Sequence, residues 1–252
     1  DNYNVVAGTA SGVINKATLN VNAVTNTRTY DGTDLSAGVV DITGVQTGDT
    51  VTAQQEFDSR NAGNRTLSVT GVVVNDGNNG DNYNVVAGTA SGVINKATLN
   101  LNAVTDTRTY DGTDQSAGVV DITGVQTGDT VTAQQEFDSR NAGNRTLSVA
   151  GVVVNDGNNG DNYNVVAGTA SGVINKATLN VNAVTNTRTY DGTDLSAGVV
   201  DITGVQTGDT VTAQQEFDSR NAGNRTLSVT GVVVNDGNNG DNYNVVAGTA
   251  SG

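Results

Sequence analysis

The sequence of 252 residues contains no cysteine, histidine, proline, methionine or tryptophan. Without cysteine the chain can form neither disulfide bonds nor thiolate metal sites. Without cysteine and histidine it cannot assemble the usual nucleophile–base pairs of acyl-transfer enzymes. Small secreted eukaryotic domains generally depend on disulfides. The composition therefore favours a bacterial surface protein over a eukaryotic one.

Basic residues are also scarce. The chain has 12 lysines and arginines against 26 acidic residues, which gives a net charge of −14. Nucleic-acid binding needs clustered lysine and arginine to displace counterions, and anionic membrane surfaces attract the same side chains. No apolar run approaches the ~20 residues of a membrane-spanning helix. We therefore expect no nucleic-acid partner and no membrane insertion by this segment.

One 80-residue unit makes up almost the whole chain. It occupies residues 1–80, 81–160 and 161–240, and residues 241–252 begin a fourth copy. The first and third copies are identical, whereas the second differs from the first at four positions. These differences are Val21/Leu101, Asn26/Asp106, Leu35/Gln115 and Thr70/Ala150. A repeat of this length indicates a structural unit, and many copies of one unit provide length, stiffness or multivalency.

Apolar and polar residues alternate within each copy with a period of two, which is typical of β-strands. The first copy has six such runs, at residues 3–7, 13–24, 27–30, 38–45, 51–57 and 66–74, the longest being 13–24. Asn- and Gly-rich turns separate them. The sequence predicts an all-β fold of three tandem small antiparallel β domains, of sandwich or curled-sheet type, arranged as an elongated rod.

The domain boundaries depend on where the repeat starts. The small residues of Gly8–Gly12 are the weakest strand formers ahead of the longest run, so we expect the joint there. The repeats are then 13–92, 93–172 and 173–252, and residues 1–12 are the last strand of a preceding repeat. Such a short connector forces neighbours into contact, and we expect Tyr83 to pack at that joint.

The acidic residues could in principle supply a catalytic carboxylate pair. The candidates in the first copy are Asp31, Asp34, Asp41, Asp49, Glu56 and Asp58. The favoured interpretation is that they are solvated charges in turns, with Tyr30 filling the edge of the core. We expect no catalytic residue, no cofactor and no enzyme activity.

Three further features have a possible chemistry. The oxygen-rich segment 75–81, which includes Asp76, could bind calcium, but a flexible hairpin turn is favoured, because its spacing differs from an EF-hand loop. Lys16, the one lysine of its copy, could be cross-linked to an asparagine, and the favoured alternative is a solvated lysine that guards the sheet. Asn64-Arg65-Thr66 matches the N-glycosylation acceptor triplet.

Four motifs in fixed order resemble a known family. They are Ile-Asn-Lys-Ala-Thr-Leu at 14–19, Thr-Arg-Thr-Tyr-Asp-Gly-Thr at 27–33, Phe-Asp-Ser-Arg-Asn-Ala-Gly-Asn at 57–64 and Asp-Asn-Tyr-Asn-Val at 81–85. The unit resembles the YDG-type and related glycine-rich β repeats of giant bacterial surface adhesins, which include filamentous-haemagglutinin-like proteins. The resemblance implies an extracellular location at the bacterial cell surface, in repeats that mostly act as spacers.

We therefore expect structural stalk repeats that project a distal binding region and support adhesion or biofilm formation. The expected partners are the neighbouring repeats of the same chain and a host or matrix ligand held by a distal domain. The alternative is a multivalent binding module, in which each repeat weakly binds a glycan, a matrix protein or a neighbouring cell.

Overall fold

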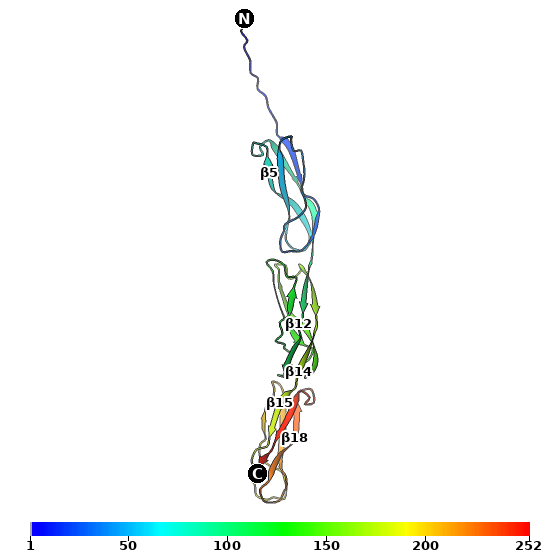
Figure 1. The fold of residues 1–252 in the computed structure, drawn as a ribbon, viewed down its shortest axis with the longest axis vertical. Coiled ribbons are helices and arrows are strands. Elements are labelled where there is room, and N and C mark those ends of the chain that lie inside the picture. Colours follow the sequence, from blue (N-terminus) through cyan, green and yellow to red (C-terminus); the bar gives the residue numbers. More distant parts are fainter. Residues whose placement is uncertain (1) are drawn as a thin grey trace. The chain divides into compact units, whose positions relative to one another are not determined.

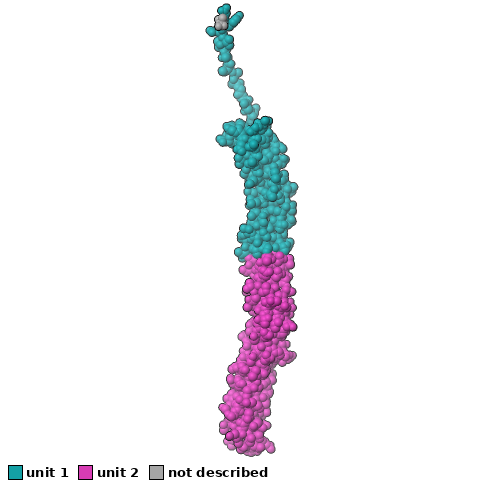
Figure 2. Space-filling model, viewed as in Figure 1, with its two compact units in different colours: residues 1–98, 124–130, 154–164 teal, residues 99–123, 131–153, 165–252 magenta. Residues whose placement is uncertain are grey.

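The computed structural model describes residues 2–252, and these residues form β-strands and no helix (Figure 1). The all-β fold class is therefore confirmed. Two compact units divide the chain (Figure 2). Unit 1 comprises the residues up to 98 together with 124–130 and 154–164, and unit 2 comprises 99–123, 131–153 and 165–252.

Unit 1 holds one complete β-sandwich with two sheets. Its strands are β1 (Ala17–Asn22), β2 (Asn26–Thr29), β3 (Asp41–Thr43), β4 (Thr50–Phe57), β5 (Gly63–Asn75), β6 (Tyr83–Gly88) and β7 (Ala90–Asn95). One sheet has the strand order β3-β1-β6 and the other β2-β7-β5-β4. Each repeat therefore folds as a small two-sheet domain.

The following strands repeat the pattern. They are β8 (Ala97–Asn102), β9 (Asp106–Thr109), β10 (Asp121–Thr123), β11 (Thr130–Phe137), β12 (Gly143–Asn155), β13 (Tyr163–Gly168), β14 (Ala170–Asn175), β15 (Ala177–Asn182), β16 (Asp201–Thr203), β17 (Thr210–Phe217), β18 (Thr226–Asn235), β19 (Tyr243–Gly248) and β20 (Ala250–Ser251). Their sheets have the orders β10-β8-β13, β11-β12-β14-β9, β16-β15-β19 and β17-β18-β20. Within unit 2, β15 and β18 carry labels in Figure 1.

Most neighbouring strands are antiparallel, but the end of each repeat pairs parallel with its beginning. β6 runs parallel to β1, and β7 runs parallel to β2. Parallel partners need a long crossover between them, and here the body of the repeat provides it. The last two strands therefore close the sandwich, a feature that the alternation of residues does not predict.

The core of the first sandwich follows the two-residue period. Leu19 and Val21 of β1 and Leu67 of β5 are fully buried, whereas Thr18 is exposed. The partly buried residues around them are mostly valine and alanine. Burial of such side chains stabilises the fold by about 25 cal/mol per Å² of apolar surface. Because aromatic residues are few, several valines share this role.

A buried glutamine fastens the connections before and after β2 to the core. The Gln55 side chain accepts a hydrogen bond from the Val24 N–H at 2.7 Å and donates to the Val24 carbonyl at 2.9 Å. Its amide nitrogen also donates to Ser36 Oγ at 2.9 Å. An added Cβ on Gly38 would overlap this amide. The side chain thereby replaces a strand partner for a stretch with little regular structure.

The long strand β5 bends at a bulge. The pairing with β4 shifts between Thr52 and Gln54, so that Gly71 and Val72 lie opposite a single residue. Gly71 has a φ of 58°, the left-handed conformation that a bulge of this kind requires. The bulge increases the local twist of the sheet.

The expectation of a single long strand over 13–24 is wrong. In the next copy of this sequence, β7 ends at Asn95 and β8 begins at Ala97, and the two belong to different sheets. Ala97 N–H donates to the Asn162 carbonyl at 2.9 Å, which starts the new pairing immediately. Lys96 is therefore the point where one sandwich passes into the next.

The small residues equivalent to Gly8–Gly12 lie inside a sandwich and are not a connector. β6 ends at Gly88 and β7 starts at Ala90, so the chain changes sheets there. A Cβ on Gly92 would lie 2.6 Å from Phe57, so this position needs glycine for close packing. β7 extends three residues past the expected boundary at 92, and its Ile94 is buried.

The N-terminal segment has the sequence of β6 and β7 but a different environment. Tyr3 is 94% exposed, whereas its equivalent Tyr83 is 4% exposed. Ile14 is fully exposed, whereas Ile94 is 1% exposed. Residue 1 of the expected preceding strand at 1–12 lies outside the described residues. Within the described part, residues 2–16 form no strand.

The surroundings of three of the four variable positions show what each exchange changes. Leu35 is 59% exposed and Gln115 is exposed, so an exchange of polarity is tolerated there. Val21 and Leu101 are both fully buried, so the core accommodates the extra methylene of leucine. Thr230 Oγ1, at the position of Ala150, is buried without a hydrogen-bond partner among the described residues.

Candidate functional site

The most elaborate polar cluster of unit 1 joins residues from two successive repeats. Its centre is Asp129, whose side chain is fully buried. Asp129 Oδ2 accepts hydrogen bonds from the hydroxyls of Tyr30 at 2.9 Å and Tyr163 at 2.6 Å. Its Oδ1 lies 3.3 Å from Nη2 of Arg60. We call this cluster the joint.

Tyr30 reaches the joint from the end of β2. Its N–H donates to the Asn95 carbonyl at 2.8 Å, which prolongs the pairing between β2 and β7. The turn after it is held by Asp31, whose carboxylate accepts from the Thr33 N–H at 2.9 Å, and by an ion pair between Arg28 and Asp31. These local bonds aim the tyrosine ring at the next repeat.

Tyr163 approaches from the other side of the joint. Its hydroxyl accepts a hydrogen bond from the Gln126 N–H at 2.8 Å while it donates to Asp129. The rings of Tyr30 and Tyr163 lie edge to face, with centroids 5.5 Å apart and an interplanar angle of 80°. Such aromatic pairs contribute about 0.5–1.5 kcal/mol beyond their buried area. The joint is therefore both apolar and hydrogen-bonded.

Arg60 ties the cluster together from the turn between β4 and β5. Its guanidinium donates to the carbonyl oxygens of Gly32 at 3.3 Å and Asp156 at 2.6 Å, in addition to Asp129. The side chain is 35% exposed, so water screens part of its attraction to the carboxylate. Its planar fork of donors suits it to hold several acceptors at once.

A second contact lies beside the first. Ala62 N–H donates to Oδ1 of Asn162 at 2.8 Å. Asn162 is fully buried, whereas Asn82, the equivalent residue of the first sandwich, is exposed. The same residue is therefore covered when another repeat lies against it.

The turn that carries Asn162 is organised by Asp156. Its carboxylate accepts hydrogen bonds from the backbone N–H groups of Asn158, Gly160 and Asn162 at 2.7, 2.9 and 3.1 Å. Burial by itself would raise the pKa of Asp156, but the hydrogen bonds from Gly160, Asn158 and Asn162 together outweigh it and lower the pKa below 3.8. The carboxylate is thus ionised and already fully engaged.

Unit 2 contains the same arrangement between the second and third repeats. Asp209 accepts from Tyr110 at 2.9 Å and from Tyr243 at 2.7 Å, and it lies 3.3 Å from Arg140. Ala142 N–H donates to Asn242 at 2.8 Å. The joint is therefore a repeated element of the chain and not a single occurrence.

Burial affects the ionisation of the joint tyrosines. Together with the hydrogen bonds to Asp129 and Asp209, it raises the pKa of Tyr30 and of Tyr110 to about 12. Burial likewise raises the pKa of Tyr163, reinforced by Asp129. The hydroxyls therefore remain protonated donors at neutral pH.

The candidate acidic residues of the sequence do not gather into one site. Asp31 holds its own turn, and Asp49 accepts from Tyr83 at 2.5 Å. The Asp34 carbonyl accepts from the Phe57 N–H at 2.8 Å, and the Asp58 N–H donates to the Thr66 carbonyl at 2.9 Å. Of the described residues, no three acidic side chains come together as a metal site.

In the turn considered for calcium, the Asp76 carboxylate already accepts hydrogen bonds. Asp76 Oδ1 accepts from the N–H groups of Asn78 and Gly80, both at 2.8 Å. Lys16 lies 3.5 Å from Asp81, and both side chains are well exposed. Asn64 is exposed and pairs with Val93 in the sheet. Calcium binding stays the less favoured alternative to a hairpin turn, and the triplet that starts at Asn64 stays an acceptor sequence without a predicted modification.

The sequence reasoning placed Tyr83 at the joint, and its equivalents Tyr163 and Tyr243 lie there. It assigned Tyr30 to the core edge, whereas Tyr30 also enters the joint. It missed Arg60 and the carboxylate of Asp129. The close spacing of Asn, Asp and Tyr around residues 76–83 indicates the segment that carries the equivalents of Asp156, Asn162 and Tyr163, but no signal in the sequence indicates Arg60 or Asp129.

The groups of the joint are hydroxyls with raised pKa values, carboxylates that accept hydrogen bonds and one guanidinium, and they bind one another across the two repeats. Of the described residues, none belongs to a helix that is long and apolar enough to cross a membrane. The arrangement holds two repeats against each other.

The sequence profile of the YDG domain matches the chain three times, over residues 15–91, 95–171 and 175–251. The chain therefore belongs to the YDG domain family, as the motifs indicated. No curated protein matches the chain.

Two solved structures share some likeness with this chain. One is Drosophila N-cadherin EC1-4, with 9% identity, a TM-score of 0.21, and coverage of 88% of this chain and 75% of that one. The other comprises three N-terminal domains of the outer capsid protein Hoc of bacteriophage RB49, with 15% identity, a TM-score of 0.21, and coverage of 86% and 80%. Scores this low carry no argument about fold or function.

The first prediction concerns Gly32, which has a φ of 86°. A Cβ added at this position would overlap the carbonyl oxygen of Thr127. Gly32→Ala should cost about 1–2 kcal/mol for its backbone conformation and a further 1–3 kcal/mol or so for displacing Thr127. Gly192→Ala is the matched control, because Gly192 has a φ of 85° and nothing within 4 Å of a Cβ. Denaturant unfolding should show the larger loss of unfolding free energy for Gly32→Ala. Equal losses in the two variants would contradict a packed joint.

The second prediction concerns the central carboxylate. Asp129→Asn places an amide N–H₂ beside Arg60 and removes a charged acceptor, so it should destabilise the chain by about 1.5–3 kcal/mol. Asp49→Asn is the control, since Asp49 accepts from Tyr83 of its own repeat. Denaturant unfolding should show the larger loss for Asp129→Asn, and a larger loss for Asp49→Asn would be evidence against the joint.

The third prediction is loss of the joints at high pH. A tyrosine whose folded pKa lies above its unfolded value of 10.0 stabilises the protein fully below pH 10, and this contribution disappears as the pH rises through the folded pKa. For Tyr30 and Tyr110 that window extends from 10.0 to about 12. The absorbance of tyrosinate should rise in a late step above pH 10, and the amplitude of this step should be smaller in the Tyr30→Phe variant. An unchanged titration in this variant would contradict the assignment.

Proposed function

We propose that this chain is a structural, non-enzymatic stalk segment of a bacterial cell-surface adhesin. Its repeats would project a distal binding region away from the cell and so support adhesion or biofilm formation. The observation that supports this most is the joint, which occurs in the same form in unit 1 and in unit 2. A spacer needs such a contact, because domains joined only by flexible chain do not transmit a fixed direction.

Three properties of the joint suit that role. The carboxylate of Asp129 is buried, so salt screens it little. Its partners come from both repeats, and the connection through Lys96 is one residue long between β7 and β8. Bending at the joint would therefore break several hydrogen bonds together.

One observation favours the alternative of a repeated binding module. Val85 and Val86 of β6, at the edge of the three-stranded sheet, are 46% and 52% exposed. Their equivalents in β13 and β19 are similarly exposed. An exposed edge strand can pair with an extended partner. Binding that rises steeply with the number of repeats would support this alternative.

The fourth prediction is that the chain is extended in solution. Small-angle scattering of the 252-residue protein should give a maximum dimension above about 100 Å, because each repeat is built of strands that rise about 3.3 Å per residue. A single globule of this length would instead have a radius of gyration of about 18 Å. The double variant Asp129→Asn/Asp209→Asn should broaden the distribution of dimensions. A compact particle would overturn the proposal.

A further inference from the structure

The first and last strands of the sandwich in unit 1 run side by side in the same direction. β6 pairs with β1 in one unbroken register from Ala17 to Asn22, and β7 pairs with β2 over Asn26–Thr29. Both ladders have the same offset between partners, and only Thr89 separates β6 from β7. The chain therefore enters the sandwich at one end of the paired strands and leaves it at the other. In unit 2, β14 and β19 likewise run parallel to β9 and β15.

The two strands at which the chain enters and leaves have partners on both sides. β1 is the central strand of its sheet, between β3 and β6, and β7 lies between β2 and β5. The second ladder of β7 is antiparallel and places Ile94 opposite Gly63. Neither β1 nor β7 can therefore be peeled away from the edge of a sheet.

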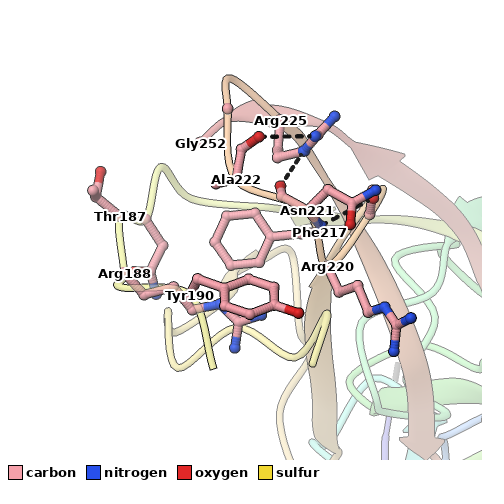
Figure 3. Close-up of a pocket in the computed structure, with 12 residues that line it drawn as sticks. Thr187, Arg188, Tyr190, Phe217, Arg220, Asn221, Ala222, Arg225 and Gly252 are labelled. Carbon is pink, nitrogen blue, oxygen red and sulfur yellow. Dashed lines mark hydrogen bonds between the residues drawn. The ribbon is translucent and has the colours of Figure 1, made fainter. Parts of the chain in front are cut away.

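The antiparallel neighbour of β7 begins at a turn that its own arginine holds. Arg65 of β5 donates to the carbonyl oxygens of Asn61 and Ala62 at 2.9 and 3.0 Å. Arg225 makes the same two contacts in the last repeat, as Figure 3 shows. β7 therefore lies against a strand whose start is fixed by side-chain hydrogen bonds.

Buried side chains cover the inner faces of both parallel ladders. Leu19 and Val21 of β1 and Ile94 of β7 have almost no exposed surface. A Cβ added to Gly88 would overlap Oδ1 of Asn22, so the Asn22 side chain lies close against the end of β6. Water has little access to the ladder bonds from this side, so a bond that breaks here is not readily replaced by one to water.

The connection out of this sandwich leaves little slack in the chain. Tyr30 N–H donates to the Asn95 carbonyl at 2.8 Å, and Ala97 N–H donates to the Asn162 carbonyl at 2.9 Å. Only Lys96 lies between β7 and β8. Tension in β7 is therefore passed to the first backbone bond of β8 through a single residue.

We propose that each sandwich resists tension along the chain, with its parallel first and last strands acting as a mechanical clamp. Tension pulls β1 and β7 in opposite directions along their own axes. The hydrogen bonds of the parallel ladders are then sheared and must break together, which makes forced unfolding slow. If the chain left the sandwich at the end where it entered, the same bonds would open one after another.

Resistance to tension goes beyond the role of a spacer. A spacer needs a fixed direction, which the joint supplies, whereas a clamp needs bonds that are loaded in shear inside each repeat. The clamp depends on the strand pairing of one sandwich, and neither on the joint nor on a location at the cell surface. Scattering tests the extended form and pulling tests the clamp, so either proposal can fail alone.

The experiment compares two directions of pulling on the first sandwich of the complete chain. The chain has no cysteine, so two introduced cysteines can carry the handles of an optical trap. Lys16→Cys/Lys96→Cys places the handles at opposite ends of the ladders. Lys16→Cys/Asp81→Cys places them at the same end, since Lys16 lies 3.5 Å from Asp81. The ion pairs lost in these variants are exposed and contribute little to stability.

At the same force, the variant pulled from opposite ends should unfold at least about tenfold more slowly than the variant pulled from one end. A difference of one net hydrogen bond in the barrier is enough for this ratio. Each event between residues 16 and 96 should lengthen the chain by about 240 Å, because roughly 80 residues extend at ~3.6 Å each from folded strands about 45 Å long. Equal rates in the two directions, or faster unfolding from opposite ends, would overturn the proposal.

Two adjacent valines of β6 provide a matched pair of variants. The carbonyl oxygens of Asn82 and Gly88 accept hydrogen bonds from β1. Alternate residues of a strand direct their backbone groups to the same side, so the N–H of Val86 faces β1 and that of Val85 faces away. Both side chains are about half exposed. Because proline has no N–H, Val86→Pro removes a bond of the ladder and Val85→Pro does not.

With handles at residues 16 and 96, Val86→Pro should unfold more than about tenfold faster than Val85→Pro at the same force, because it lacks a sheared hydrogen bond. The lengthening of the chain shows in each trace that the sandwich was folded before the pull. If Val86→Pro gives no such step, the comparison of directions in the two cysteine variants decides alone. If Val85→Pro unfolds as fast as Val86→Pro, the parallel ladder does not resist the force and the proposal is wrong.

Discussion

The contact between successive repeats is centred on one buried carboxylate with donors from both sides. Asp129 is stable in a buried position only because two hydroxyls and a guanidinium satisfy its oxygens. Tyr30 and Arg60 come from the repeat before it, and Tyr163 comes from its own repeat. An ionised group without those donors would need water, so the requirement to satisfy the charge keeps the surfaces together.

Arginine supplies the positive charge at the joint. Arg60 carries a positive charge that is independent of pH in the physiological range, and its donors reach a carboxylate and two carbonyl oxygens. With Asp156 held by backbone N–H groups, the acidic side chains of the joint already have partners. A chain with a net charge of −14 can therefore bring acidic surfaces together.

The strands were largely predictable, but their assignment to sheets was not. The alternation around Leu19 and Val21 and the glycines of the turns follow directly from local chemistry. The change of sheet at Lys96 cannot be recognised from the sequence, because a lysine between two strands has the same pattern as a polar residue within one strand. The joint was not predictable either, since Tyr30 and Asp129 are 99 residues apart in sequence. Near-identical copies provide no variation from which such a pairing could be inferred.

Identity of the copies has a consequence for specificity. Every repeat presents the same donor surface and the same acceptor surface, so the energy of a joint does not tell one copy from another. Only the covalent order selects the partner, through the single residue between β7 and β8. That residue makes the effective concentration of the correct neighbour high. A well-satisfied joint and a short connector are therefore needed together: the first supplies the contact energy, and the second decides which repeat receives it.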